Sequence, residues 1–163
     1  MKKRNAFTIP EVLSVMFVML IVSAIVFYLL FFIFKSMDRI NFSIKTTAIY
    51  EKVSYNLENI FSNYYFSDDE KPVVKNNYIS FPSKKISDDL NPQNSTIEVL
   101  FDSIKNQLSM KIDGSNSGWK LEDETLKDVN FSYDVKNRSI VASFVFSKGN
   151  FHINKTAKYT TQN

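Results

Sequence analysis

The sequence predicts an α+β fold in which one long N-terminal helix is followed by an antiparallel β-sheet. Two observations lead to this prediction. An uncharged apolar run extends from Val12 to Phe34, and no proline or glycine occurs between Val12 and Lys71. After it, apolar and polar residues alternate in several short segments, as they do in half-buried strands. A chain of 163 residues has room for one ordinary domain with such an appendage.

The composition excludes several kinds of site. The chain has no cysteine, 3 glycines and a single histidine, His152. Disulfides, thiolate catalysis and cysteine-bound zinc are therefore excluded, and glycine-rich phosphate loops and histidine metal clusters are disfavoured. The formal net charge is +3, and Lys2, Lys3 and Arg4 supply all of it. Because the rest of the chain is electrically balanced, we expect no direct binding of nucleic acid.

The apolar run has the properties of a membrane-spanning helix. It contains about 23 residues, which as a helix extend roughly 35 Å, enough to cross the hydrocarbon core of a bilayer. The run is longer than the core of a secretory signal peptide, and no small-residue cleavage site follows it. We therefore expect a retained single-pass anchor. The basic residues before it predict a cytoplasmic N-terminus and a C-terminal domain on the far side.

The junction between the basic leader and the span contains a carboxylate, Glu11, directly before the apolar run. An ionisable group at this depth is costly and needs a partner. Cleavage between Ala6 and Phe7 would create an amino group four residues before Glu11. Glu11 could then pair with that amine, either its own or that of a neighbouring subunit. Pro10 would lie in the first helical turn, where its missing N–H costs little.

The short basic leader, the small residue Ala6, the pattern Phe-Thr-x-x-Glu from Phe7 to Glu11 and the long apolar helix together resemble the prepilin signal of type IV pilins and pseudopilins. The resemblance implies that a prepilin peptidase cuts after Ala6 and methylates Phe7, and that Glu11 guides the subunit into a filament. The residue before the cut is usually glycine in that family, whereas here it is alanine. The resemblance is close over roughly the first 35 residues and extends to the rest only in layout.

The helix is expected to continue beyond the span, from about Thr8 to about Tyr65, roughly 85 Å in all. Apolar residues recur at steps of three and four, so one face should be covered by a sheet. These residues are Met37, Ile40, Ile44, Ala48, Ile49, Val53, Leu57, Ile60 or Phe61, and Tyr64. The charged run before Pro72 should end the helix. The expected layout is a leader (1–6), a transmembrane half (7–34), an amphipathic half (35–66) and an extracytoplasmic β-rich domain (67–163).

The C-terminal domain should contain antiparallel strands joined largely by tight turns. We expect hairpins around the turns 103–106 and 134–138. The expected strands are 77–81, 96–102, 107–112, 129–133 and 139–147, with an edge strand at 150–155. A long helix followed by such a meander is the layout of pilin-like proteins, and the resemblance adds that the sheet wraps the helix.

Candidate chemistry in this domain is sparse. The segment from Asp113 to Glu124 loosely matches a calcium loop, with Ser115 and Ser117 in place of the usual acidic or amide ligands. A plain turn explains the segment better, so we expect no cofactor, with calcium as the alternative. His152 has no identifiable acid and nucleophile beside it, so we do not expect an enzyme. Trp119 is expected to pack in the core.

Two classes of function remain. The first is a structural subunit stored in the cytoplasmic membrane, then cleaved, methylated and assembled with other pilins or pseudopilins by an inner-membrane platform. A glycine-poor start and no disulfide resemble a minor pilin or pseudopilin. The layout is most similar to J-type minor pseudopilins of type II secretion and to the corresponding minor subunits of competence pili. The second is an uncleaved single-pass anchor whose outer β domain binds a ligand.

Overall fold

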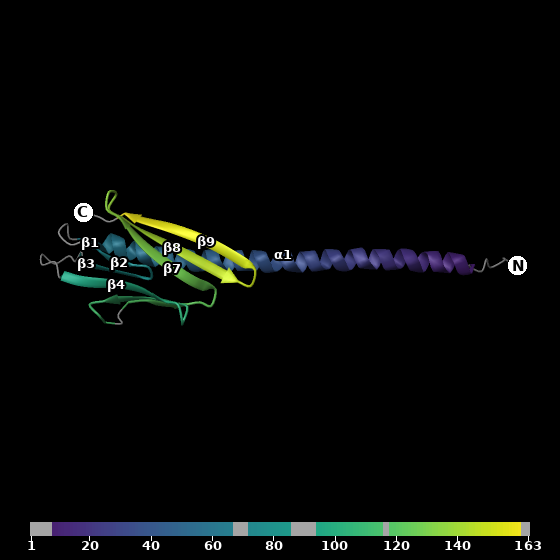
Figure 1. Cartoon of the computed structure of the whole chain (residues 1–163), viewed down its shortest axis with the longest axis horizontal. Coiled ribbons are helices and arrows are strands. Elements are labelled where there is room, and N and C mark those ends of the chain that lie inside the picture. The colour runs from purple at the N-terminus through teal and green to yellow at the C-terminus, as the bar shows by residue number, and fades with distance from the viewer. Residues whose placement is uncertain (1–7, 67–71, 86–93, 116–117, 161–163) are drawn as a thin grey trace. The chain divides into compact units, whose positions relative to one another are not determined.

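The computed structural model of the chain describes residues 8–66, 72–85, 94–115 and 118–160 (Figure 1). One helix, α1 (Ile9–Asn63), precedes nine strands in two antiparallel sheets. This arrangement confirms the predicted α+β class. The chain divides into two compact units, residues 1–41 and residues 42–163, and each is described by itself below.

Helix α1 is 55 residues long, close to the predicted extent. It begins at Ile9 because Thr8 caps its first turn, as detailed below. It ends at Asn63, two residues before the predicted end, because Tyr64–Phe66 forms strand β1 and pairs with β3. The observed end agrees to within two residues with the end predicted at about Tyr65, and strand pairing of β1 with β3 begins where the helix stops.

The larger sheet has the order β1-β3-β4-β5-β6, with β2 also paired to β3. The predicted hairpin around 103–106 is confirmed, since Asp102 pairs with Gln107 across the turn. Strands β1, β2 and β6 were not expected; each has three residues, too few to show an alternating pattern. The strands are β1 (Tyr64–Phe66), β2 (Val73–Lys75), β3 (Tyr78–Lys85), β4 (Asn94–Asp102), β5 (Gln107–Ile112) and β6 (Lys120–Glu122).

The smaller sheet has the order β7-β8-β9, with β7 at Leu126–Asp134, β8 at Ser139–Lys148 and β9 at Phe151–Thr160. The predicted hairpin around 134–138 is confirmed by the pairing of Asp134 with Ser139. The edge strand expected at 150–155 is instead ten residues long and pairs with β8 along its whole length. Gly149 opens the β8–β9 turn with φ of 58°, which fits a type II′ hairpin with glycine in the first central position.

The core of the second unit lies between the C-terminal part of α1 and both sheets. Phe61 packs against Phe81 of β3 and Tyr159 of β9, with ring centroids 5.5 and 5.0 Å apart. Tyr50 meets Phe144 of β8 edge-on at 5.7 Å. The helix therefore joins the two sheets into one core, which supports the prediction that a sheet covers its amphipathic half.

The face of α1 that packs differs in part from the predicted stripe. Val53, Leu57, Ile60 and Phe61 are buried as expected, but Met37, Ile40, Ile44 and Ala48 are exposed. Phe42 and Thr46 are buried in place of the earlier part of the stripe. Phe42 stacks on Phe151 at 6.0 Å, and the Thr46 hydroxyl donates to the Ser43 carbonyl, so this polar residue is satisfied when buried. At about 100° per residue, Met37, Ile40, Ile44 and Ala48 lie on the side opposite this buried face.

An ion pair fixes the helix to the loop between β6 and β7. Lys45 Nζ lies 3.1 Å from Asp123 Oδ2, and the side chain of Asp123 is largely buried. Burial alone would raise the pKa of Asp123, but hydrogen bonds from the Thr125 side chain and backbone, together with Lys45, lower it below the ordinary value of 3.8. This carboxylate therefore holds its charge in the folded state and ties the helix to the β6–β7 loop.

Candidate functional site

The N-terminal end of α1 is closed by reciprocal hydrogen bonds between Thr8 and Glu11. The Thr8 amide donates to Glu11 Oε2 at 3.2 Å, and the Thr8 hydroxyl donates to the same oxygen at 3.3 Å. In return, the amides of Glu11 and Val12 donate to the Thr8 carbonyl at 3.0 and 3.2 Å. Thr8 is the N-cap and Glu11 the third helical residue, and the bond from the Thr8 amide to Glu11 is the glutamate half of a capping box, while the Thr8 hydroxyl donates to Glu11 instead of accepting from its amide. Glu11 also lies where the helix dipole favours a negative charge.

This capping box was missed by the sequence reasoning, although the sequence contains its signature. A threonine followed three residues later by glutamate, directly before an apolar run, is typical of a helix N-terminus. The prediction from the sequence was that Glu11 pairs with an amine. In the structure its carboxylate accepts hydrogen bonds from Thr8 of the same chain. The pairing expected after cleavage remains a prediction.

The residues immediately after the cap satisfy their polar atoms locally. Pro10 is the second residue of the helix, where an N–H would have no intrahelical partner, so the ring is tolerated. The Ser14 hydroxyl donates to the Pro10 carbonyl at 2.8 Å. Farther along, the Ser36 hydroxyl donates to the Phe32 carbonyl at 2.9 Å. The hydroxyls of Ser14 and Ser36 are therefore satisfied within the helix.

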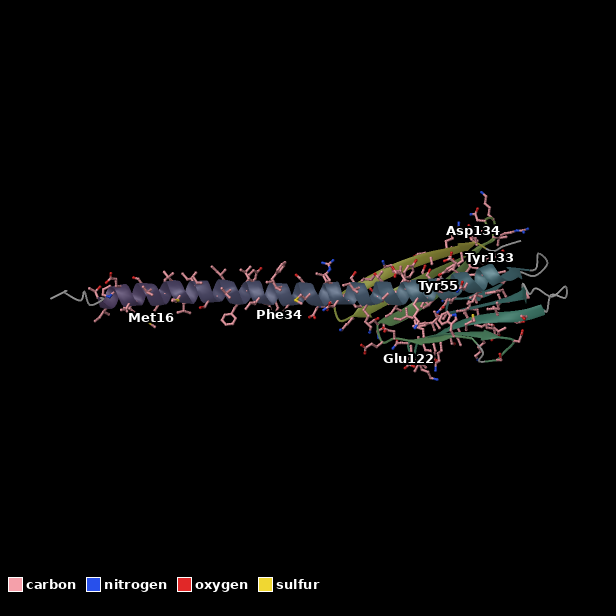
Figure 2. All side chains as sticks on the ribbon, turned by 180° about the vertical axis from the view of Figure 1, so that it is seen from behind. Met16, Phe34, Tyr55, Glu122, Tyr133 and Asp134 are labelled. Carbon is pink, nitrogen blue, oxygen red and sulfur yellow. The ribbon has the colours of Figure 1, made fainter. Side chains whose placement is uncertain are left out.

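The helix beyond the cap exposes apolar side chains on all sides, as Figure 2 shows along the stretch that includes Met16 and Phe34. Every residue from Val12 to Phe34 is exposed in the first unit. Within the described part of the chain, one helix is long and apolar enough to cross a membrane, and it is this one. A helix that is apolar all round needs lipid or other helices as its surroundings.

The other residues of the predicted N-terminal site lie outside the described residues. These are the leader residues Lys2, Lys3 and Arg4, and the cleavage and methylation residues Ala6 and Phe7. The structure therefore describes Glu11 and its cap, and leaves the leader and cleavage assignments as predictions.

The candidate calcium loop is described in part, since Ser117 also lies outside the described residues. Asp113 Oδ1 accepts a hydrogen bond from the Thr96 amide at 2.7 Å, and Asp113 has φ of 51°, as in a tight turn. The Ser115 hydroxyl donates to the Ile112 carbonyl at 2.7 Å. Glu124 is exposed. Among the described residues, no three His, Asp or Glu side chains are grouped so as to hold a metal ion. These bonds are those of a turn, and calcium remains untested.

His152 and Trp119 are the two remaining residues considered from the sequence, and they lie on a strand surface and against the core respectively. His152 is exposed on β9. Trp119 is half-buried against the core, and its carbonyl accepts from the Met110 amide at 2.9 Å. The strands approach closely here: a Cβ on Gly118 would lie 2.0 Å from the Met110 carbonyl oxygen. Glycine is therefore required beside Trp119 for packing.

A groove that was not predicted from the sequence runs between α1 and β9 in the second unit. It has a volume of about 500 Å³. The Tyr50 hydroxyl donates to the Thr156 carbonyl at 3.1 Å near one end, and the hydroxyls of Ser54 and Tyr159 lie 3.1 Å apart. Burial raises the pKa of Tyr159 to about 12, so its phenol stays protonated. The residues that line the groove are Tyr50, Ser54, Glu58 and Phe61 of α1 and residues 156–160 of β9.

Comparison with protein-family models, with curated proteins and with solved structures finds no match for this chain. The features of the chain that bear on its function are therefore the helix, its N-terminal cap and the groove.

Proposed function

We propose that this chain is the precursor of a minor pilin or pseudopilin, cleaved after Ala6, N-methylated at Phe7 and assembled into a filament. The observation that supports it best is the position of Glu11. Its carboxylate sits in the first turn of a helix whose next six turns expose no charged side chain. A carboxylate in the first turn of the helix could form an ion pair with an amino group at the same depth on a neighbouring helix.

The capping box suggests how such a subunit waits for assembly. In the single chain, Glu11 Oε2 accepts from the Thr8 amide and hydroxyl, which are neutral donors. A hydrogen bond from a charged amine is roughly twice as strong as one from a neutral donor. The new amino group of a neighbouring subunit would therefore compete with Thr8 for Glu11. Assembly would exchange a local cap for an intermolecular ion pair.

The apolar surface of α1 fits both stages of this role. From Val12 to Phe34 it can be surrounded by lipid while the precursor is stored in the cytoplasmic membrane, with the leader in the cytoplasm. In a filament it can be surrounded by equivalent helices. The peptidase and the assembly platform would be separate proteins. The layout is most similar to J-type minor pseudopilins of type II secretion and to competence-pilus minor subunits.

The test is mass spectrometry of the N-terminal peptide from the protein in its own membranes. We expect a peptide that begins at Phe7 and carries one additional methyl group. A peptide that retains Met1 or Lys2 would contradict the proposal, because the chain would not have been cut after Ala6.

The second candidate is an uncleaved single-pass anchor whose outer domain binds a ligand, and the groove beside β9 is the observation that favours it. In that case an intact N-terminus would be found, and Glu11→Val would leave the function unchanged. Loss of filament assembly or secretion in the same variant, with insertion intact, would favour the filament subunit.

A further inference from the structure

Strand β9 forms a margin of the smaller sheet (Figure 1). It pairs with β8 from Phe151 to Thr160, and no other strand in the described part of the chain pairs with it. Its second edge is therefore ten residues long without a strand partner there. An edge strand of this length presents a row of backbone donors and acceptors that another strand can use.

The turn geometry identifies which residues face the open edge. In a hairpin with a two-residue turn, the residues that flank the turn exchange hydrogen bonds, and here they are Lys148 and Phe151. Odd-numbered residues of β9 therefore bond to β8, and even-numbered residues direct N–H and C=O outward. An independent contact agrees: the Thr156 carbonyl accepts from the Tyr50 hydroxyl of α1 rather than from β8.

The groove described above runs along this edge for the last part of β9. Its other wall is the helix, through Tyr50, Ser54, Glu58 and Phe61. A molecule that fills it and satisfies the outward groups must offer donors and acceptors at a repeat of two residues, about 6.6 Å. A polypeptide in the extended conformation has this repeat, and strand addition to an open edge is a common mode of peptide recognition.

The charges beside the edge select among polypeptides. Strand β9 carries Lys155 and Lys158 and no acidic residue. Lys155 Nζ lies 5.7 Å from the ring centre of Tyr50, close to the groove, and Lys158 lines it. Pairing of β9 with a second copy of itself would bring four lysines into one ladder without a carboxylate, which is unfavourable. The acidic residue among the lining side chains, Glu58, belongs to the helix wall rather than to the strand.

We propose that the free edge of β9 and the adjoining groove bind an extended acidic segment of a partner protein by strand addition. The partner strand would bond to the outward groups of residues 154–160. Its Asp or Glu side chains would lie beside Lys155 and Lys158. This surface belongs to the second unit and depends on neither cleavage nor filament assembly, so its test is separate from the N-terminal peptide analysis.

The test is amide hydrogen exchange, followed by NMR, on the full chain in lipid nanodiscs. In the free protein, the amides of residues 153, 155, 157 and 159 should exchange slowly, and those of residues 154, 156, 158 and 160 quickly. A blocked seven-residue peptide of valine with two glutamates three positions apart, which therefore lie on opposite faces as Lys155 and Lys158 do, should slow the second set at least about tenfold and remove the alternation. The same peptide N-methylated at alternate amides is the control for backbone pairing.

Charge is tested by a lysine-containing peptide and by variants. The peptide with lysine in place of glutamate should bind about tenfold more weakly, and the double variant K155E/K158E should reverse that preference. Lys127→Glu, on an exposed position of β7, is the matched control and should leave the preference unchanged. Lys158→Pro removes an outward N–H while sparing the bonds to β8, and it should weaken binding of either peptide.

Three results would overturn the proposal. The even-numbered amides could already exchange slowly in the free chain, which would mean that the edge is covered. They could stay fast at about 1 mM of the glutamate peptide, an affinity too low for recognition. The two peptides could also bind equally well, which would remove the acidic specificity.

Discussion

Replacing Glu11 by glutamine and by valine separates its role as a helix cap from its role as a charge. Glutamine can still accept from the Thr8 amide, as the third residue of a capping box often does, but it carries no charge. Valine can do neither. The two variants are therefore matched, and both should insert into the membrane at least as well as the native chain, because each removes an ionisable group at the edge of the apolar run.

The expected effect on the cap follows from its two hydrogen bonds to Glu11 Oε2. Loss of an N-terminal cap costs about 1 kcal/mol, which corresponds to about fivefold faster exchange of the Thr8 amide in the Glu11→Val variant. A neutral acceptor forms a bond about half as strong as a charged one, so Glu11→Gln should cost about 0.5 kcal/mol and accelerate exchange about twofold. Hydrogen exchange of the full chain in nanodiscs measures both values.

The effects of the two variants on filament assembly should not follow the order of their effects on the cap, in which valine is more damaging than glutamine. If Glu11 acts by pairing with a neighbour's amine, glutamine and valine should impair assembly to the same extent, because both lack the charge. Counting filaments sheared from cells that express each variant tests this. Assembly that survives in Glu11→Gln and fails in Glu11→Val would refute the charge argument, since the cap alone would then matter. Unchanged Thr8 exchange in Glu11→Val would refute the capping box itself.

Three further predictions concern the second unit. Because the folded-state pKa of Asp123 is lowered, its carboxylate should stabilise the fold above its unfolded pKa of about 3.8, and this contribution should be lost as pH falls through the folded-state pKa. Lys45→Met removes one cause of the lowered pKa and should reduce this acid sensitivity, as measured by thermal unfolding at a series of pH values. Gly118→Ala should destabilise the fold by about 1–3 kcal/mol in chemical unfolding, because the added Cβ would meet the Met110 backbone carbonyl of β5; Gly149→Ala should also destabilise, but through the strain of an alanine at φ of 58°, since the space around it is open. Phe144→Ala should cost about 3–5 kcal/mol in the same assay, because its ring is fully buried; a loss below about 1 kcal/mol would mean that the site collapses around the gap.

Long-range periodicity in the sequence was sufficient to predict the helix and the longer strands. The uninterrupted run to Lys71 marked α1, and alternation marked β4, β5, β7 and β8 close to their observed bounds. Three-residue strands such as β2 have no periodicity to detect. They exist because a neighbouring strand offers a hydrogen-bonding edge, which is a property of the tertiary fold.

The packed face of the helix could not be predicted from the spacing of apolar residues, for a different reason. Ile44 and Ala48 belong to a row of apolar residues at steps of three and four that is as regular as the row that packs, yet both are exposed. Thr46 is fully buried because its hydroxyl finds the Ser43 carbonyl within the helix. When apolar residues surround a helix on several sides, the choice of face depends on the shape of the sheets that receive it. That shape is set by residues about a hundred positions away, such as Phe151.

If the chain assembles as proposed, the uniformly apolar surface from Val12 to Phe34 also explains why assembly would depend on one carboxylate. Lipid chains are as apolar as leucine, so a helix of this kind gains little hydrophobic free energy by leaving lipid for the company of other helices. Apolar contacts alone can therefore store the subunit in a membrane and also pack it among other helices, without strongly favouring either state. A polar group in the first turn can favour one state, because an ion pair in a surrounding of low dielectric is strong and requires a partner at the same level. In the described helix, Glu11 is the charged group at that end, and under the proposed function a neighbour's charged amine would displace its present partner, Thr8.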